Sequence, residues 1–340
     1  MLINIKQQFI KKTSLLFLSS ILLLGCTNMI LYPVPTLKNE SVKVLEENSG
    51  KFLAENNITE NNAKTFLSQY QYDFTTIKTS DNEKLSAVEF VTKEEQAKGV
   101  VLFLHGNNDD IYKQSLLNNA LLFLESGYNL LVLDYRGYGK STGSPSPKGL
   151  NLDIQATVKY LTKEYTNIYI YAQSIGGTSL LGALDEINQS KIRAIATEGS
   201  FLSYKQLSKA VKISIPFTNY KEIESYAPLS TKRDLNLPLL LIHSIEDEVI
   251  PYSQGKALHA HFKNSKHIAT TGRHLGYLTS SIELDSVLKF YDENKDYQAP
   301  IKIKPTDLNT STENNISTNK ELNQTTENNG SIAIDLNTTK

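Results

Sequence analysis

The chain has 340 residues, of which 40% are hydrophobic, so it can build one large α/β domain or two small ones. Its formal net charge is −1, and it has no dense Lys/Arg stripe, which argues against a nucleic-acid-binding surface. The only cysteine is Cys26, which excludes an internal disulfide and a thiolate metal site. We therefore expect the fold to depend on its hydrophobic core.

The N-terminal segment has the features of a secretory signal. Lys6, Lys11 and Lys12 precede an apolar run from Leu15 to Leu24, which is shorter than the roughly 20 residues that span a bilayer. The run ends in Leu23-Leu24-Gly25-Cys26, which resembles the bacterial lipobox. The resemblance implies that residues 1–25 are a signal peptide and that the Cys26 thiol is acylated. The alternative is an ordinary signal peptide with a chance cysteine.

Lipidation of Cys26 predicts the location of the protein. Several acyl chains give stable anchoring where one would be marginal, so we expect a lipid-anchored membrane protein of the cell envelope. The next residue is Thr27 rather than Asp. By resemblance to the enterobacterial sorting rule, this favours the outer membrane.

Two polar regions flank the central part of the chain. Residues 26–71 include Pro33 and Pro35 and predict a stalk followed by a short helical segment. Residues 299–340 are rich in Asn, Thr and Glu and contain a loose repeat that begins at Leu308. With few apolar groups to offset the entropy of ordering, this region is predicted to be a disordered tail.

The central residues 72–298 alternate between short apolar runs and segments with helical periodicity. Residues 73–79 and 85–92 predict two strands joined by a turn at Ser80-Asp81-Asn82. Continuous apolar runs predict buried parallel strands at 99–104, 129–133, 168–171, 192–196 and 238–242. Helices are predicted at 151–165, 177–188, 253–263 and 280–294. This pattern predicts an α/β fold with a mostly parallel central sheet, an antiparallel N-terminal edge, and helices on both faces.

A candidate nucleophile follows the strand at 168–171. The sequence Ala172-Gln173-Ser174-Ile175-Gly176-Gly177 lies between that strand and a helix, where a sharp turn would raise the Ser174 hydroxyl above the sheet edge. Ala172 occupies the first glycine position of the Gly-x-Ser-x-Gly pattern and is small enough for such a turn. The alternative is a glycine-rich turn capped by a serine.

Two backbone N–H groups are candidates for an oxyanion hole. The N–H of Ile175 starts the helix after Ser174 and would face a developing oxyanion. The loop Leu104-His105-Gly106-Asn107 follows another buried strand and can present the N–H of Asn107. His105 is expected to bond the loop backbone, with a role as proton shuttle as the alternative.

A serine needs a general base, and His274 is the best placed histidine. It lies in the loop Thr271-Gly272-Arg273-His274 that follows a strand predicted at 266–270. The remaining histidines of the latter half of the chain are expected to be core or surface residues: His243, His259, His261 and His267.

The acid that orients the histidine is predicted to be Asp247. It follows the strand at 238–242 and precedes the run Val249-Ile250-Pro251 that re-enters the structure. Glu246 and Glu248 are expected to point to solvent. Glu198, at the end of the strand at 192–196, is the alternative acid.

Five segments together carry a family resemblance. They are Leu104 to Asn107, Asp134-Tyr135-Arg136-Gly137-Tyr138-Gly139-Lys140-Ser141, Gln173 to Gly177, Asp247 to Pro251 and Gly272 to His274. They resemble the α/β-hydrolase superfamily, in particular its small-cap branch of serine aminopeptidase-like or alpha/beta-hydrolase-domain proteins. The order Ser174, Asp247, His274 is the one expected for that fold. The resemblance implies that residues 134–141 form a structural loop beside the site, and no helix-opening Gly-x-Gly-x-x-Gly unit supports a nucleotide site there.

The resemblance also implies a small cap at 200–237, where aromatic residues would shape the acyl or leaving-group pocket: Phe201, Tyr204, Phe217, Tyr220 and Tyr226. The alternative is a structural helix pair, which is compatible with a cap. The predicted function is a serine esterase that acts on a small acyl substrate and needs no metal or organic cofactor. A peptidase or amidase for short peptides or cell-wall material is the first alternative. A non-catalytic binding or assembly factor with a hydrolase fold is the second.

Overall fold

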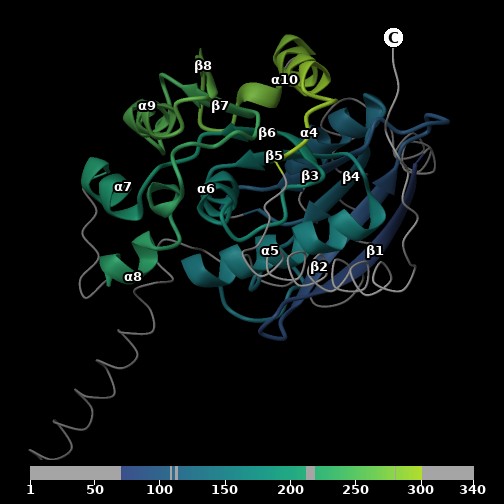
Figure 1. Ribbon diagram of the computed structural model, residues 1–340, viewed down its shortest axis with the longest axis horizontal. Helices are drawn as coiled ribbons and strands as arrows, with labels where there is room; N and C mark the ends of the chain where they lie inside the picture. Colours follow the sequence, from purple (N-terminus) through teal and green to yellow (C-terminus); the bar gives the residue numbers. More distant parts are fainter. Residues whose placement is uncertain (1–69, 108, 112–113, 212–218, 280, 301–340) are drawn as a thin grey trace, which may run out of the picture. The chain divides into compact units, whose positions relative to one another are not determined.

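The computed structural model describes residues 70–107, 109–111, 114–211, 219–279 and 281–300 (Figure 1). The predicted signal peptide, Cys26, nearly all of the stalk at 26–71 and nearly all of the tail at 299–340 lie outside these residues. The strands are β1 (Gln71–Lys78), β2 (Lys84–Val91), β3 (Val100–Leu104), β4 (Asn129–Leu133), β5 (Ile168–Gln173), β6 (Ile192–Glu198), β7 (Leu239–Ser244) and β8 (Lys266–Thr270). The helices are α4 (Gln114–Glu125), α5 (Pro147–Glu164), α6 (Ile175–Gly182), α7 (Tyr204–Ala210), α8 (Tyr220–Glu224), α9 (Tyr252–His261) and α10 (Ser281–Glu293), with 3₁₀ turns η1 (Pro228–Ser230) and η2 (Tyr277–Thr279).

All eight strands form one sheet in the order β1-β2-β4-β3-β5-β6-β7-β8. The β1–β2 and β2–β4 pairs are antiparallel, and the remaining pairs are parallel. This confirms the predicted mostly parallel sheet with an antiparallel N-terminal edge. The first two strands are joined by the predicted turn, in which Asn82 has a positive φ of 72° and the Thr79 hydroxyl donates to Asp81 at 2.6 Å.

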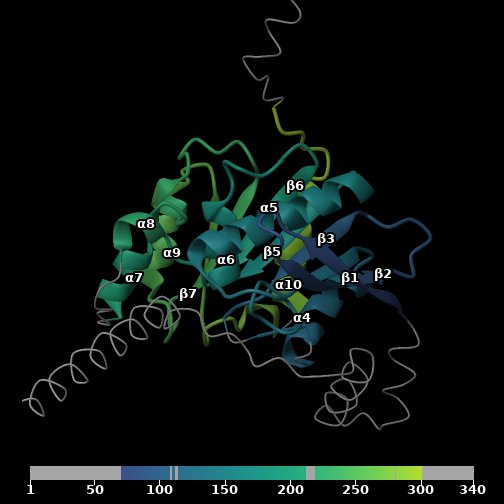
Figure 2. The same cartoon turned by 90° about the horizontal axis from the view of Figure 1, so that it is seen from below.

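Helices cover both faces of the sheet, as the two views in Figure 1 and Figure 2 show. Successive residues of the fully buried β3 point to opposite faces, so Leu102 belongs to one apolar cluster and Phe103 to the other. Helices α5, α6 and α9 supply side chains to the first cluster, and α4 and α10 to the second. Each fully buried side chain of this size contributes about 1.5–3 kcal/mol of hydrophobic stabilisation. Burial on both faces explains why β3 is a continuous apolar run.

Outside the predicted cap, three helices differ from the sequence prediction by more than two residues at an end. Helix α4 was not predicted. Helix α5 begins at Pro147 rather than 151, because Ser146 caps it by accepting from the Gly149 N–H at 3.0 Å and proline fits the first turn. Helix α6 is predicted at 177–188 but begins directly after Ser174 and ends at Gly182, where a Cβ would lie 2.1 Å from the Tyr226 carbonyl oxygen.

The insertion between β6 and β7 is where the cap is predicted. Its described residues form α7, α8 and η1, and residues 212–218 lie outside the described part of the chain. Phe201 and Tyr204 are buried and pack edge-to-face with ring centroids 5.2 Å apart. These two aromatic residues therefore belong to the hydrophobic core, and their predicted part in shaping a pocket stays a prediction.

The carboxyl ends of the parallel strands lie along one edge of the sheet. The predicted site residues follow β3, β5, β7 and β8, and Glu198 ends β6. Because the strands run in the same direction, these segments meet at that edge even though they are far apart in sequence.

Candidate active site

Ser174 lies at a sharp turn between β5 and α6. Its backbone φ is 51° and its ψ is −117°, a conformation that non-glycine residues rarely adopt. The Ser174 N–H donates to the carbonyl of Glu198 at 2.7 Å, and its own carbonyl accepts from the Thr178 N–H at 3.0 Å. These two bonds hold the strained turn between the neighbouring strand and the first turn of the helix.

Small residues allow this turn to fit. A Cβ at Gly176 would lie 2.4 Å from the Tyr135 hydroxyl oxygen and 2.7 Å from the His105 carbonyl oxygen. A Cβ at Gly177 would lie 2.1 Å from the Ser200 hydroxyl oxygen. Ala172, in contrast, is fully buried and pairs with Leu104 and Thr197 on the two neighbouring strands. A methyl group is therefore accommodated at that position of the pattern.

The structure brings Ser174, His274 and Asp247 together. The Ser174 Oγ lies 3.2 Å from His274 Nε2, and His274 Nδ1 lies 2.7 Å from Asp247 Oδ2. The side chains of His274 and Asp247 are 12% and 1% exposed, so the imidazole is partly exposed while the carboxylate is enclosed. A proton on Nδ1, shared with Asp247, leaves the Nε2 lone pair directed at the serine hydroxyl.

The Asp247 carboxylate is fixed by its own loop. Its Oδ1 accepts from the N–H groups of Val249 at 2.9 Å and Ile250 at 2.7 Å, while Oδ2 faces His274. Burial alone would raise the pKa of Asp247. The hydrogen bond and charge of His274, with the two backbone donors, outweigh burial and hold the pKa below its ordinary value. Asp247 is therefore an ionised acceptor over the whole neutral range.

Glu246 and Glu248 were expected to point to solvent. They are exposed as expected, but both also make hydrogen bonds that the sequence did not predict. The Glu246 carboxylate accepts from the Gly272 N–H at 2.8 Å. The Glu248 carboxylate accepts from the His274 N–H at 3.0 Å and from Arg273 Nε at 3.3 Å. The loop after β7 that carries Asp247 (the acid loop) therefore holds the backbone of the loop after β8 that carries His274 (the histidine loop) at Gly272 and at His274.

His243 also lies beside the acid, a position that the sequence did not indicate. Its Nε2 is 2.8 Å from the Ile250 carbonyl oxygen and 3.5 Å from Asp247 Oδ2. Burial lowers the pKa of His243, which favours the neutral ring that donates to the Ile250 carbonyl. The signal that could have found it is its spacing of four residues before Asp247.

The remaining histidines of this half of the chain bond local groups. His259 Nδ1 is 2.9 Å from the Ser265 hydroxyl, and His261 Nε2 is 3.2 Å from the Thr231 carbonyl oxygen. His267 lies on β8 with its ring stacked on Tyr252. None of these contacts involves the serine or the acid loop carboxylates.

The alternative acid, Glu198, does not bond the imidazole. Its carboxylate accepts from the Tyr171 hydroxyl, the Gln173 side-chain amide and the Tyr277 N–H, at 2.8, 2.9 and 2.8 Å. His274 Nδ1 is occupied by Asp247. Of the two candidate acids, Asp247 is therefore the one that contacts the imidazole.

The two predicted oxyanion donors belong to two segments that lie next to Ser174. Ile175 is the first residue of α6, so its N–H has no acceptor within the helix. The loop that carries Asn107 passes close to the serine, since a Cβ at Gly106 would lie 3.6 Å from Ser174 Cβ. The Asn107 side chain accepts from the Tyr138 hydroxyl at 2.6 Å, which anchors the loop next to residues 134–141.

His105 lies in the same loop but is fully buried. Its Nδ1 is 2.7 Å from the Gly106 carbonyl oxygen, and its Nε2 is 3.6 Å from Asp134 Oδ1. Tyr135 donates to the His105 carbonyl at 2.9 Å. Both ring nitrogens face groups of the loops themselves, which agrees with the expected structural role rather than with the alternative of a proton shuttle.

The segment 134–141 is a buried support for the site. Gly139 has a φ of 46°, and a Cβ there would lie 1.8 Å from Asp134 Oδ2. Arg136 binds Asp153 through Nε at 2.9 Å and Asp81 through its terminal nitrogens at 2.8 and 3.0 Å. These contacts connect the segment to α5 and to the β1–β2 turn, consistent with the structural loop that the resemblance implied.

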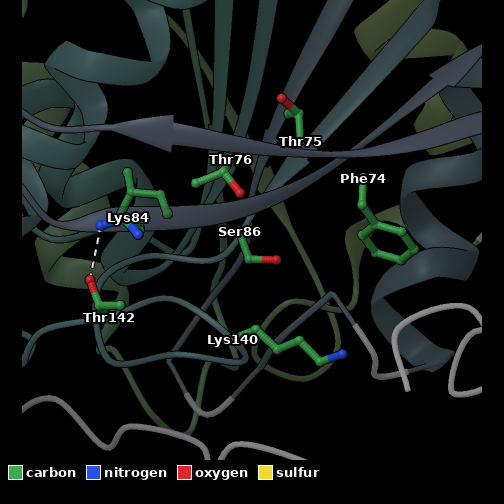
Figure 3. A pocket seen from close by; sticks show the side chains of 8 residues that line it. Phe74, Thr75, Thr76, Lys84, Ser86, Lys140 and Thr142 are labelled. Carbon is green, nitrogen blue, oxygen red and sulfur yellow. Dashed lines mark hydrogen bonds between the residues drawn. The ribbon is translucent and has the colours of Figure 1, made fainter. Parts of the chain in front are cut away.

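Two hollows of about 260 and 490 Å³ lie elsewhere, against β1, β2 and α5. Figure 3 shows the smaller one, lined by Phe74, Lys84 and Lys140 among other residues. The larger one carries three lysines: Lys78, Lys159 and Lys163. Neither hollow is lined by Ser174, His274 or Asp247, so both lie apart from the candidate active site.

The structure also bears on other classes of site. Within the part of the chain that it describes, no cluster of His, Cys, Asp or Glu side chains is arranged to hold a metal ion. Within the same residues, no helix is long and apolar enough to cross a bilayer.

Comparisons with known proteins agree with this architecture. Residues 99–228 match the family described as alpha/beta hydrolase fold. The chain is similar to YfhR, an uncharacterized protein of Escherichia coli K12, at 30% identity over 51% of this chain and 61% of that protein. The chain thus spans about three fifths of the length of this curated relative.

Solved structures show the same fold. The chain is similar to an esterase from Pyrococcus furiosus, with a TM-score of 0.57 and 20% identity over 77% of this chain and 99% of that one. It is also similar to an acylaminoacyl peptidase from Pyrococcus horikoshii, with a TM-score of 0.54 and 18% identity over 70% of this chain and 44% of that one. At these identities the likeness establishes the fold and leaves the substrate open.

Proposed function

We propose that the chain is a serine hydrolase of the α/β-hydrolase superfamily that uses Ser174, His274 and Asp247; the match of residues 99–228 to the alpha/beta hydrolase fold supports the superfamily. One observation carries the proposal: the continuous chain of contacts from Ser174 Oγ to His274 Nε2 at 3.2 Å, and from His274 Nδ1 to Asp247 at 2.7 Å. A strained serine, a base within hydrogen-bond reach and a buried acid that orients the base are what nucleophilic acyl transfer needs.

The reaction proceeds in two steps. His274 Nε2 takes the hydroxyl proton while Ser174 Oγ attacks the acyl carbonyl, and Asp247 stabilises the imidazolium that forms. The imidazolium then gives its proton to the leaving group, which departs and leaves an acyl-enzyme. In the second step His274 activates a water molecule that releases the acid and restores the serine hydroxyl.

The oxyanion of each tetrahedral intermediate would be held by the N–H groups of Ile175 and Asn107. Helix α6 adds the positive end of its dipole at the same point. Losing one such donor typically lowers kcat by roughly 10²- to 10³-fold. Apart from the substrate and the attacking water, these steps use groups of the chain itself, and the proposed reaction needs no cofactor.

For the substrate, we propose a small ester at the cell envelope. A serine–histidine pair of this kind cleaves activated esters most readily, and the proposed acylation of Cys26 would hold the domain at a membrane. The ester proposal is tested against two alternatives. The first is a peptide or other amide substrate, and the second is a binding role without turnover.

The test is a panel of p-nitrophenyl esters and aminoacyl amides with wild type and Ser174→Ala. We expect ester turnover that the Ser174→Ala variant loses. Turnover of amides alone would assign a peptidase or amidase. Equal inactivity of both proteins on the whole panel would support the binding role.

The location is tested separately by Cys26→Ser. The proposed anchor predicts that this variant leaves the membrane fraction while wild type stays in it. Retention of Cys26→Ser in that fraction would contradict lipidation as the tether.

A further inference from the structure

A buried carboxylate next to the proposed triad has no role in the acyl-transfer steps themselves. Glu198 is the last residue of β6 and is 3% exposed. No lysine or arginine of the described residues forms an ion pair with it. A buried carboxylate without a cationic partner is costly to ionise, so its presence at this position calls for a physical explanation.

The hydrogen bonds of Glu198 reach both halves of the site. Oε2 accepts from the Tyr171 hydroxyl at 2.8 Å and from Gln173 Nε2 at 2.9 Å, and Oε1 accepts from the Tyr277 N–H at 2.8 Å. Gln173 is the residue before Ser174, and Tyr277 lies three residues after His274. One carboxylate therefore links the strand that carries the nucleophile to the loop that carries the base.

The backbone of the same residue strengthens this link. The Glu198 carbonyl accepts from the Ser174 N–H at 2.7 Å, so main chain and side chain together hold the turn. The next residue, Gly199, has a φ of 61°, and a Cβ there would lie 2.9 Å from His274 Cε1 and 3.1 Å from His274 Nδ1. The imidazole thus packs directly on the end of β6.

Several charged groups surround this imidazole. Asp247 and Glu248 face the histidine and its N–H from the acid loop, Arg273 precedes it, and His243 lies behind Asp247. Burial raises the pKa of Glu198, while its three donors and the charge of His274 partly offset that rise. The ionised form accepts all three donated hydrogens, whereas a proton on either oxygen would compete with one of them.

We propose that Glu198 is a positioning residue for the serine hydrolase reaction: it fixes the spacing between Ser174 and His274, and its charge is a second anion that favours the imidazolium form of His274. This inference rests on the proposed function. Asp247 orients the ring through Nδ1, and Glu198 acts through Gln173, through the Tyr277 backbone and through space.

The principal test compares wild type with Glu198→Gln across pH 5 to 9, with an activated ester as substrate. The amide keeps the shape and removes the charge, and its NH₂ group leaves at least one of the three donors without an acceptor. We expect kcat to fall by about 10- to 100-fold with little change in KM, and the acidic limb of the pH–rate profile to move down by about 0.5 to 1 pH unit. Glu293→Gln, on the exposed side of α10, is the matched control and should change neither quantity.

A second variant separates charge from shape. Glu198→Asp keeps the charge and shortens the side chain, so it should lower kcat while leaving the acidic limb near its wild-type position. If both variants shifted the limb equally, or if Glu198→Gln lowered kcat and Tm without moving the limb, Glu198 would be a structural residue only. Unchanged kcat in a folded Glu198→Gln would refute the proposal outright.

An independent readout distinguishes this inference from the proposed function. In the full chain with ¹³C-labelled histidine rings, the NMR titration midpoint of His274 should move to lower pH in Glu198→Gln. If wild type turned over no ester and no amide but this midpoint still moved, the proposed reaction would fail while the coupling between Glu198 and His274 would stand. If wild type were active and the midpoint did not move, the charge coupling would fail and the reaction would stand.

Discussion

Two histidine–aspartate pairs in this molecule show how the same residue types serve chemistry in one place and structure in another. In the first pair, His274 and Asp247 are 2.7 Å apart, and the imidazole is 12% exposed with its second nitrogen 3.2 Å from Ser174 Oγ. In the second, His105 and Asp134 are 3.6 Å apart and both side chains are fully buried. The two pairs differ in what the second nitrogen of the imidazole ring faces. It is the Ser174 hydroxyl for His274 and the Gly106 backbone carbonyl for His105.

The two aspartates differ in their hydrogen-bond donors and in the direction of their pKa shifts. Asp247 receives two backbone N–H groups on one oxygen and His274 on the other, and these donors keep its pKa below the ordinary value despite burial. Asp134 receives the Ile111 N–H at 2.8 Å, and burial raises its pKa. A carboxylate that accepts several hydrogen bonds stays ionised and can stabilise a transient imidazolium. The fully buried His105–Asp134 pair (the sealed pair) instead holds two loops together.

The largest expected effect that separates the pairs is on turnover. His274→Ala should lower kcat by at least about 10⁴-fold, because the serine then lacks a base, with Tm close to that of wild type. The measurement is ester hydrolysis together with thermal unfolding. Residual activity within about 10-fold of wild type would mean that another group, His105 included, is the base.

The next effect concerns the acid. Asp247→Asn should lower kcat by about 10³- to 10⁴-fold, because an amide no longer fixes the histidine tautomer that points its lone pair at Ser174. Asp134→Asn, measured beside it, should affect kcat far less. Equal losses in the two variants would erase the distinction between the pairs.

The sealed pair should respond in stability. His105→Ala removes a fully buried ring and leaves Asp134 without its partner, so the free energy of unfolding should fall by about 2–4 kcal/mol. Urea unfolding of this variant and of His274→Ala gives the comparison. A stable His105→Ala protein would contradict the structural role of that histidine.

A smaller effect is expected from the exposed carboxylate that holds the histidine loop. Glu248→Gln should lower kcat by a few-fold, because the amide oxygen can still accept from the His274 N–H but loses the charge that attracts Arg273. Steady-state kinetics at two ionic strengths checks this. Lys266→Gln, which removes a remote surface ion pair with Glu293, is the control.

The smallest effect is the pH dependence of stability at low pH. Because the native pKa of Asp247 is lowered, its contribution is fully present above the unfolded pKa of about 3.9 and is lost as pH falls through the native value. Wild type should therefore lose stability below about pH 4 more steeply than Asp247→Asn. Parallel curves for the two proteins would show that Asp247 is not held in its ionised form.

Much of the fold follows from local patterns that the sequence displays. The buried strands are continuous apolar runs, and the turn around Asn82 has clear local chemistry. The cap at Ser146 has such chemistry as well, but the sequence prediction did not use it and began the helix four residues late. Helix α4 was missed because its leucines crowd together around Asn118 and Asn119, which blurs the helical period. Helix α6 is buried on all sides, so the sequence offered no polar face from which to place its ends.

The candidate site was predicted where one residue follows one strand, as with Ser174 and Asp247. The contacts of Glu246 and Glu248 could not be predicted, because each depends on how two loops from neighbouring strands approach each other. The contacts of His243 lie within one strand and the loop that follows it, and the spacing of four residues before Asp247 was the signal that could have found them. Local sequence gives the type of a side chain and its place along a strand, while such distances depend on the packing of the whole sheet.

The role of Ser174 as the nucleophile is tested most directly by covalent labelling with a fluorophosphonate. Ser174 Oγ would attack phosphorus, fluoride would leave, and the hydroxyl proton would pass to His274. We predict one labelled peptide, containing Ser174, in wild type, no label in Ser174→Ala, and much slower labelling in His274→Ala. A folded wild-type protein that stays unlabelled, or that is labelled at another serine, would contradict the assignment.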